Sequence, residues 1–300
     1  MRFGIFGGNV APGPIDRVID AVREAEAAGF DHYFLPQIFE LEAMTTLAVV
    51  GREVPRIGLG TAVIPTYPRH PMTMAQQALT VQAATGNRFI LGIGLSHQIV
   101  IEHMLGYSYD KPLRHMREYL DVLMPLLHDR TVSVSGETVS GHLSLDIRGV
   151  EAPPVSIAAL GPKMLELAGR VADGTVTWMT GPTTLAAHIV PTITAAARDA
   201  GRPAPAIGAA LPVMVTDDVD AARTLADSEF AIYNQLPSYR AMLDREGAAG
   251  PGAVAIVGSD AEVRSGIAGM EAAGVTDFVA VEFGDQDQKK RTRDLLTSLL

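Results

Sequence analysis

The stretch Arg88-Phe89-Ile90-Leu91-Gly92-Ile93-Gly94-Leu95-Ser96-His97 decides the fold of this 300-residue chain. Its apolar run is typical of a strand that is buried on both faces of a parallel sheet. Its two glycines lack a Cβ, so either a neighbouring backbone or a ligand can come close to them. The serine and histidine at its end place polar side chains where the strand stops. Amides that begin the following helix would favour an anion at the same place.

Strand and helix patterns alternate on both sides of this stretch. Upstream, short apolar runs begin at residues 3, 31 and 56, and each is followed by a helical pattern. Downstream, the pattern predicts further strands over residues 155–159, 174–178, 207–215 and 277–283. A spacing of roughly 30 residues is typical of parallel βαβ units. Eight such steps predict an α/β fold, a (β/α)8 TIM barrel whose catalytic residues lie at the carboxyl ends of the strands.

Two segments interrupt the repeat. Residues 131–146 alternate between polar and apolar side chains around two glycines, which predicts a small inserted antiparallel hairpin. Residues 233–252 contain several glycines and prolines, which predicts an irregular loop region before strand 8 that acts as a lid or substrate loop. Since the composition does not shift along the chain, we expect a single domain over residues 1–300.

Composition excludes several classes of function. A net charge of −10 argues against a nucleic-acid partner, and the absence of cysteine excludes disulfides and thiolate nucleophiles. The histidines show no metal-ligand spacing, so we expect no metal. The chain begins directly with a strand, and its apolar runs are too short to cross a bilayer. We therefore expect a soluble, cytoplasmic protein that binds no membrane.

Several motifs together resemble one known superfamily. They are Phe3-Gly4-Ile5-Phe6, Ala27-Ala28-Gly29-Phe30-Asp31, Gly58-Leu59-Gly60-Thr61-Ala62-Val63, the run from Arg69 to Gly94, Ala158-Ala159-Leu160-Gly161-Pro162 and the run from Ala168 to Gly174. The chain resembles the luciferase-like superfamily and, within it, the oxidoreductases that depend on the deazaflavin coenzyme F420. The resemblance covers nearly the whole chain.

The resemblance implies where the cofactor binds. The F420 ring would lie against a bulge at Ala62 and Val63, joined by a non-proline cis peptide bond. The phosphate tail would pass two short segments whose small side chains and open amides suit a flat ring and an anionic tail. The cofactor-binding residues of these segments would be Leu95, Ser96 and His97, and then Ala158, Ala159, Leu160 and Gly161.

The chain departs from sugar-phosphate-oxidising relatives in two places. It has Pro36-Gln37 where they carry Asp-His, and His97 where they carry an acid. An amide cannot take the proton of an alcohol, so Gln37 favours reduction of an activated double bond over alcohol oxidation. We expect two catalytic residues, with Gln37 orienting the substrate and His97 contacting the cofactor or donating a proton. His97 could instead cap its loop, and Trp178 could either pack under the cofactor or line the substrate mouth.

The leading interpretation is therefore an enzyme that moves hydride between F420 and a small organic substrate, as a reductase. Two alternatives remain: an FMN-dependent luciferase-like monooxygenase, with FMN in place of F420, and a non-catalytic cofactor-binding protein. The resemblance also implies a homodimer joined through residues 41–50 and 72–83. Both segments carry Leu, Met and Ala on more than one helical face.

Overall fold

The structure, a computed structural model, describes residues 1–8 and 13–300. Its strands are β1 (Arg2–Phe6), β2 (His32–Leu35), β3 (Gly58–Thr61), β4 (Ile64–Pro65), β5 (Phe89–Gly94), β6 (Thr131–Val134), β7 (Gly141–Ser144), β8 (Val155–Ile157), β9 (Gly174–Trp178), β10 (Ala206–Val215), β11 (Ile256–Gly258) and β12 (Asp277–Glu282). Its α-helices are α1 (Ile15–Ala28), α2 (Ala43–Glu53), α3 (Pro71–Ala84), α4 (Pro112–His128), α5 (Pro162–Val171), α6 (Pro182–Thr184), α7 (Val190–Asp199), α8 (Val219–Glu229), α9 (Ala231–Gln235), α10 (Pro237–Glu246), α11 (Pro251–Val254), α12 (Asp260–Ala272) and α13 (Gln286–Thr297). Two π-helical segments are η1 (Ile99–Met104) and η2 (Leu185–Ile189).

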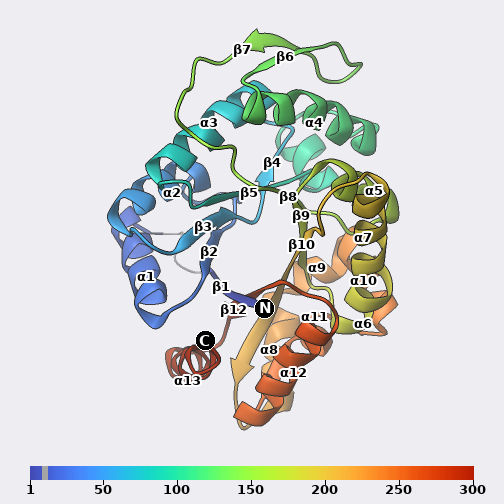
Figure 1. Cartoon of the computed structure of the whole chain (residues 1–300). Coiled ribbons are helices and arrows are strands. Elements are labelled where there is room, and N and C mark those ends of the chain that lie inside the picture. Colours follow the sequence, from blue (N-terminus) through green and yellow to red (C-terminus); the bar gives the residue numbers. More distant parts are fainter. Residues whose placement is uncertain (9–12) are drawn as a thin grey trace. The chain divides into compact units, whose positions relative to one another are not determined.

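The fold is an α/β barrel, as the repeat predicts. The barrel strands follow the order β1, β2, β3, β5, β8, β9, β10 and β12, and β12 pairs with β1 to close the sheet (Figure 1). The short strand β4 continues the line of β3, while β11 pairs with the end of β10. Strands β6 and β7 form the predicted antiparallel hairpin. Both the TIM barrel and its small insertion are therefore confirmed.

The contacts group the chain into two compact units, of which the first comprises residues 1–7, 24–34 and 159–300. Within this unit β1 lies between β2 and β12, and β10 lies between β9 and β12, all in parallel. Helices α5 and α7 pack without a gap, because a Cβ on Gly169 would lie 2.4 Å from the Ile193 carbonyl oxygen. A separate apolar cluster is built from small and sulfur-containing side chains around one aromatic ring: Met214, Ala222, Ala226, Ala255, Val257 and Phe283.

The second unit comprises residues 8–23 and 35–158. Strand β5 is its centre and pairs in parallel with β3, β4 and β8. Helix α2 packs on α3, and α3 packs on α4. The Arg88 guanidinium at the start of β5 donates to the carbonyls of Gly51 and Val54, at 3.0 Å each, and so ties the end of α2 to the sheet. The sequence stretch that begins at Arg88 therefore organises this half of the chain.

The prediction of an irregular loop over residues 233–252 is wrong. The segment forms α9, α10 and the start of α11, and its prolines stand in the first turns of α10 and α11. Proline is tolerated there because its missing N–H needs no partner in the first turn. The Glu246 carboxylate at the end of α10 accepts from the amides of Thr183 and Thr184, at 3.0 and 2.7 Å. These bonds anchor α10 to α6 within the first unit, so the segment is a packed helical layer.

Candidate active site

The bulge predicted at Ala62 and Val63 is present in the second unit. Between the pairs Gly60–Ile90 and Ile64–Ile93, one strand advances four residues while β5 advances three. The extra residue is a β-bulge, which bends the strand near a barrel rim. The peptide bond between Ala62 and Val63 is cis, as the resemblance implies. The bulge is held to β2, because the Ala62 amide donates to the Leu35 carbonyl at 2.9 Å.

Gly92 serves the bulge and not a ligand. The Thr61 hydroxyl donates to the Gly92 carbonyl and accepts from the Gly92 amide, both at 2.9 Å. A Cβ on Gly92 would lie 2.0 Å from the Thr61 carbonyl oxygen. One on Gly94 would lie 2.8 Å from Val63 Cγ2 and 3.2 Å from Ala158 Cβ. The sequence leaves open whether protein atoms or a ligand come close to the two glycines. The structure shows protein atoms close to both of them.

The same packing gathers several of the predicted cofactor residues. Val63 and Ala158 both lie against Gly94, and the Ala158 amide donates to the Ile93 carbonyl at 2.9 Å. Leu95, Ser96 and His97 follow directly and are half-buried. Ser96 has a φ of 59°, an unusual left-handed backbone for a non-glycine residue. The structure thus brings the predicted residues from β3–β4, β5 and β8 to one strand end.

His97 lies two residues before the π-helical segment η1. Its carbonyl accepts from the amides of Val100 and Ile101, at 2.9 and 3.0 Å. Burial lowers the pKa of the His97 imidazole below its ordinary value, because the charged ring loses hydration. The ring is therefore predominantly neutral at neutral pH, and a contact with a ligand is better supported than proton donation.

Gln37 has a structural partner. Its Oε1 atom accepts from the Ala43 amide at 2.9 Å, at the start of α2. Glu42 caps the same helix by accepting from the amides of Met44 and Thr45, at 3.3 and 2.7 Å. The amide oxygen of Gln37 is thus engaged with backbone, which leaves its NH2 group as the part that can orient a ligand.

The first unit holds the other predicted cofactor residues, at the start of α5. Gly161 is the N-cap of this ten-residue helix. Because glycine has no side chain, the helix has no side-chain cap hydrogen bond. No atom lies within 4 Å of the place that a Cβ on Gly161 would take. The first turn contains no acid and includes the exposed Lys163. Pro162 supplies no N–H, and the Met164 amide donates to the Gly161 carbonyl at 3.1 Å, so the Lys163 amide and its ammonium group are what this turn offers to an anion. With these groups, the segment of Ala159, Leu160 and Gly161 fits the phosphate-bearing tail of F420 or FMN.

His188 and Trp178 flank this region of the first unit in different ways. The Nε2 atom of His188 donates to the Leu160 carbonyl at 2.8 Å and holds the loop before α5. Trp178 stacks on Phe6, with ring centroids 6.3 Å apart, and meets the rings of Phe230 and Tyr233 edge to face. Its Nε1–H is buried without a hydrogen-bond partner in the described part of the chain. Trp178 is thus packed among aromatic rings, and its polar edge is left for a ligand.

Two residues near the bulge have structural roles. The Arg69 guanidinium pairs with Glu42 at 2.9 Å and is largely buried, so its charge is already compensated. His70 caps α3 by accepting from the Met72 amide, and its Nε2 donates to the Ser140 carbonyl at 3.0 Å. Arg69 therefore does not supply a free cation for the cofactor tail.

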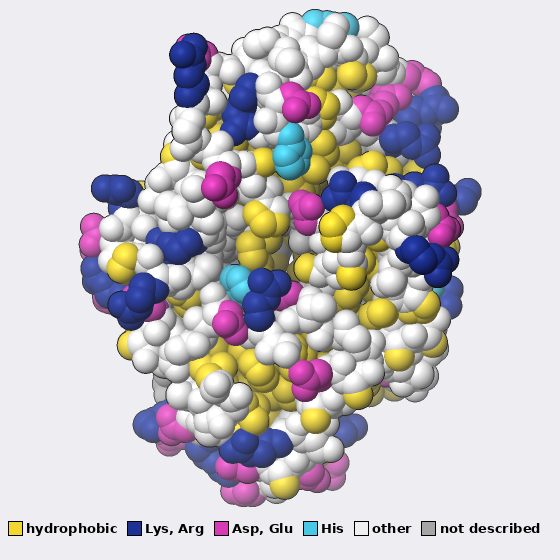
Figure 2. Space-filling view, in the orientation of Figure 1, with side chains coloured by type: hydrophobic (Ala, Val, Ile, Leu, Met, Phe, Trp, Pro, Cys, Tyr) yellow, Lys and Arg dark blue, Asp and Glu magenta, His cyan; other side chains and the backbone are white. Residues whose placement is uncertain are grey.

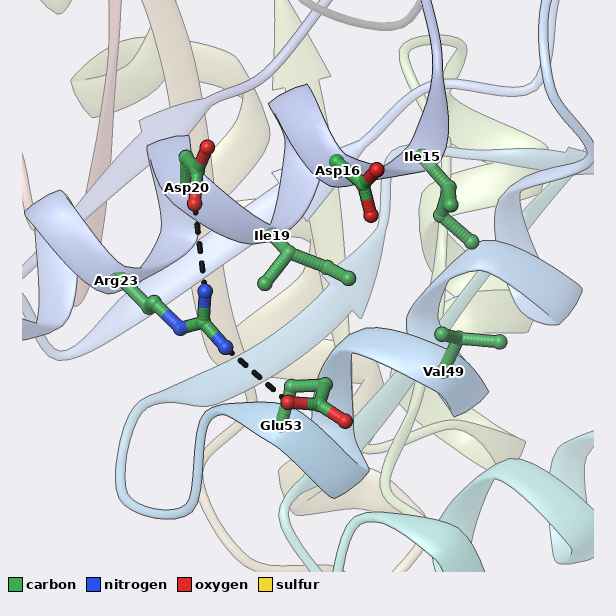
Figure 3. A pocket seen from close by; sticks show the side chains of 7 residues that line it. All are labelled: Ile15, Asp16, Ile19, Asp20, Arg23, Val49 and Glu53. Carbon is green, nitrogen blue, oxygen red and sulfur yellow. Dashed lines mark hydrogen bonds and ion pairs between the residues drawn. The ribbon is translucent and has the colours of Figure 1, made fainter.

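A second hollow lies on the surface of the second unit. A groove of about 450 Å³ between α1 and α2 is lined by Ile15, Asp16, Ile19, Asp20, Arg23, Val49 and Glu53 (Figure 3). The Arg23 guanidinium pairs with Asp20 on its own helix at 3.3 Å and reaches across to Glu53 on α2 at 3.1 Å, so its charge is compensated. On the face drawn in Figure 2, basic and acidic side chains lie intermixed. Among the described residues no cluster of His, Asp and Glu could hold a metal, and no helix could cross a membrane.

A comparison with protein families matches residues 1–285 to the luciferase-like monooxygenases. The chain belongs to this family. It is 33% identical over 190 residues to a Mycobacterium tuberculosis protein whose name assigns it to the coenzyme F420-dependent oxidoreductases. That match covers 58% of this chain and 54% of the relative, so the match spans about half of the relative's length.

Two solved structures share the fold. The coenzyme F420-dependent tetrahydromethanopterin reductase of Methanopyrus kandleri superposes with a TM-score of 0.84 at 22% identity, over 99% of this chain and 97% of that one. The oxygenating constituent of 3,6-diketocamphane monooxygenase from Pseudomonas putida, in complex with FMN, has a TM-score of 0.76 at 19% identity, over 99% and 96%. At these identities, the two likenesses show that the fold is shared.

Proposed function

We propose that this luciferase-like oxidoreductase uses coenzyme F420 to transfer hydride to a small organic substrate, as a reductase of an activated double bond. The observation that carries the choice of cofactor is the 33% identity to a Mycobacterium tuberculosis protein named as a coenzyme F420-dependent oxidoreductase. The bound cofactor would supply the hydride chemistry, and the protein the positioning. The two catalytic residues we propose are His97 and Gln37.

The protein residues would act as follows. Ala62 and Val63, on the bulge, present a flat surface of small side chains for the ring. The Lys163 amide and ammonium group at the start of α5, beside Gly161, bind the phosphate, and Leu95, Ser96 and Ala158 line the path of the tail. The Gln37 NH2 group donates a hydrogen bond to the substrate, and the neutral His97 ring contacts the cofactor. Since Gln37 cannot accept the proton of an alcohol, reduction is the favoured direction, and water supplies the proton.

Binding and turnover test this proposal. The purified protein is titrated with F420 and, separately, with FMN, and we expect the tighter binding for F420. Turnover is then followed with reduced F420 against enones, imines and quinones, and with oxidised F420 against alcohols. Tighter binding of FMN, with consumption of oxygen, would support the monooxygenase instead. Binding of F420 without turnover of any acceptor would support a cofactor-binding protein without catalysis.

We also propose a homodimer and one barrel domain over residues 1–300. Leu41 lies just before α2 and Val49 lies within it. Their side chains are 38% and 41% exposed, so two aliphatic residues of this segment face solvent. A two-fold dimer through residues 41–50 and 72–83 would cover them. Light scattering at micromolar protein is expected to give twice the chain mass, and Val49→Glu to give the single mass. A monomeric wild type would refute the dimer.

A further inference from the structure

Tyr67 belongs to a group of four aromatic rings in the second unit, two of which stack on it. We call this group the tyrosine stack: Tyr67, Tyr109, His115 and Tyr119. The ring centroid of Tyr67 is 4.0 Å from that of His115, with the planes nearly parallel, and 5.4 Å from that of Tyr109. His115 also meets Tyr119 at 5.8 Å. Since the Tyr67 ring is held by two neighbours, the direction of its hydroxyl is fixed.

The other two hydroxyls of the tyrosine stack and the Nε2 atom of His115 have partners within the protein. The Tyr109 hydroxyl donates to the Ser96 carbonyl at 3.2 Å, and the Tyr119 hydroxyl donates to the Arg69 carbonyl at 2.9 Å. The Nε2 atom of His115 bonds to the Thr66 hydroxyl at 3.1 Å. The Tyr67 hydroxyl is buried and has no partner among the described residues. A buried polar group without a hydrogen-bond partner lowers stability by about 1–3 kcal/mol. A ligand that accepts a hydrogen bond from the Tyr67 hydroxyl would remove this penalty.

The position of Tyr67 places it at the candidate active site. It follows β4 directly, two residues beyond Pro65, and the amide of the intervening Thr66 donates to the Gly94 carbonyl at 2.9 Å. Its stacked neighbour Tyr109 is bonded to Ser96, at the end of β5. Tyr67 therefore stands at the carboxyl ends of β4 and β5, where α/β barrels bind their ligands.

The chemistry around Tyr67 limits the acceptor. Burial raises the pKa of the phenol, and the nearby Tyr109, Asp110 and Glu102 raise it further, so the group keeps its proton at any working pH. The two carboxylates would repel a phosphate at this point. A neutral carbonyl oxygen suits the donor better, and the pyrimidinedione ring of deazaflavins and flavins carries two.

From this geometry we infer that the Tyr67 hydroxyl donates a hydrogen bond to a carbonyl oxygen of the bound cofactor ring. The inference rests on the proposed function, because it requires a cofactor with such a ring. It makes Tyr67 a binding residue for the ring end of the cofactor, while the start of α5 binds the phosphate.

The test compares Tyr67→Phe with the wild type in equilibrium titrations, followed by absorbance and fluorescence. The ligands are F420 and the same deazaflavin without its phosphate and tail. Phenylalanine keeps the stacking on His115 and removes only the hydroxyl. We expect binding about tenfold weaker for both ligands, and a smaller shift of the ring's absorbance band on binding. The matched control is Tyr107→Phe, whose side chain is 47% exposed, and it should bind both ligands as the wild type does.

Stability without ligand is a second readout. Removing an unpartnered buried hydroxyl should leave the free energy of unfolding in urea unchanged or slightly higher. A less stable Tyr67→Phe would mean that the hydroxyl bonds within the protein, and would overturn the inference. Unchanged affinity, or a loss confined to the phosphorylated ligand, would overturn it as well. If the wild type binds neither deazaflavin nor FMN, the proposed function fails; if it binds them and Tyr67→Phe binds equally, only this inference fails.

Discussion

The ends of β5 and β8 carry the same sequence signal and use it in opposite ways. At β5, Gly92 and Gly94 lie against protein atoms, at distances that no Cβ could occupy. After β8, Gly161 opens into free space at the N-terminus of α5. Glycine near a strand end therefore has two structural roles. Gly92 and Gly94 leave room for neighbouring protein atoms, whereas Gly161 leaves the backbone accessible to a ligand. We call the end of β5, with Gly92 and Gly94, the tight end, and the start of α5, with Gly161, the open end. The tight end orients side chains, while the open end can bind an anion.

The largest effect is expected from breaking the tight end with Gly92→Ala. The new Cβ would clash with the Thr61 carbonyl, which is backbone and cannot turn aside. We expect a loss of about 3 kcal/mol in the free energy of unfolding, measured in urea. The matched control is Gly161→Ala, where φ is −77° and the surroundings are empty. It should change the unfolding free energy by less than about 1 kcal/mol, and equal losses would contradict the comparison.

The open end is tested by charge, with Gly161→Asp. A carboxylate at the N-cap would bond the Lys163 amide that we assign to the phosphate and repel the phosphate itself. Binding of F420 should weaken about 20-fold, while the phosphate-free deazaflavin should bind as before. Gly161→Asn, which caps without charge, serves as the control and should lose less. If both deazaflavins weakened equally, the start of α5 would not be the phosphate site.

His97→Ala tests the polar side chain of the tight end. Because burial favours the neutral ring, we expect His97 to contact the cofactor and not to act as the proton donor. Turnover should fall about tenfold, below the loss of 10²–10⁴ that an essential general acid causes. His188→Ala, which removes the hydrogen bond from η2 to the Leu160 carbonyl, is the comparison variant. Undiminished turnover in His97→Ala would remove this residue from the mechanism.

The smallest effect is expected in the dependence of stability on pH. The pKa of His97 lies below its ordinary value in the folded state, so between that value and about 6.5 the unfolded state binds more protons. The contribution of His97 is therefore present above about pH 6.5 and declines as the pH falls, by at most about 1.4 kcal/mol per pH unit. Urea unfolding between pH 7.5 and 5.5 should show a shallower slope for His97→Gln than for the wild type. An identical slope would contradict the prediction.

Local patterns predicted most of the barrel, because its strands and helices carry their own periodicity. They failed over residues 233–252, where Pro237 and Pro251 begin helices and Gly247 ends one in a left-handed conformation. The same residue types that break a helix inside also mark its ends, and the sequence alone did not separate the two cases.

The site was predictable only where a motif is continuous. Resemblance correctly located the cis bond at Ala62 and Val63. Tyr67 was missed because its partners Tyr109 and His115 lie more than 40 residues away in the chain. A local sequence pattern cannot predict that rings so far apart will stack. The engagement of Gln37 by Ala43 was missed for a related reason, since a side-chain bond to a helix start depends on the path of the loop between them.

The reciprocal bonds between Thr61 and Gly92 also bear on how this enzyme can diverge. Valine at position 61 would leave both backbone groups of Gly92 without their partner, and any side chain at position 92 would strike the backbone of Thr61. Neither residue can therefore be exchanged in a single step without a loss of stability. The two positions are therefore expected to change only together. New substrate preferences can thus evolve around a bulge that remains fixed.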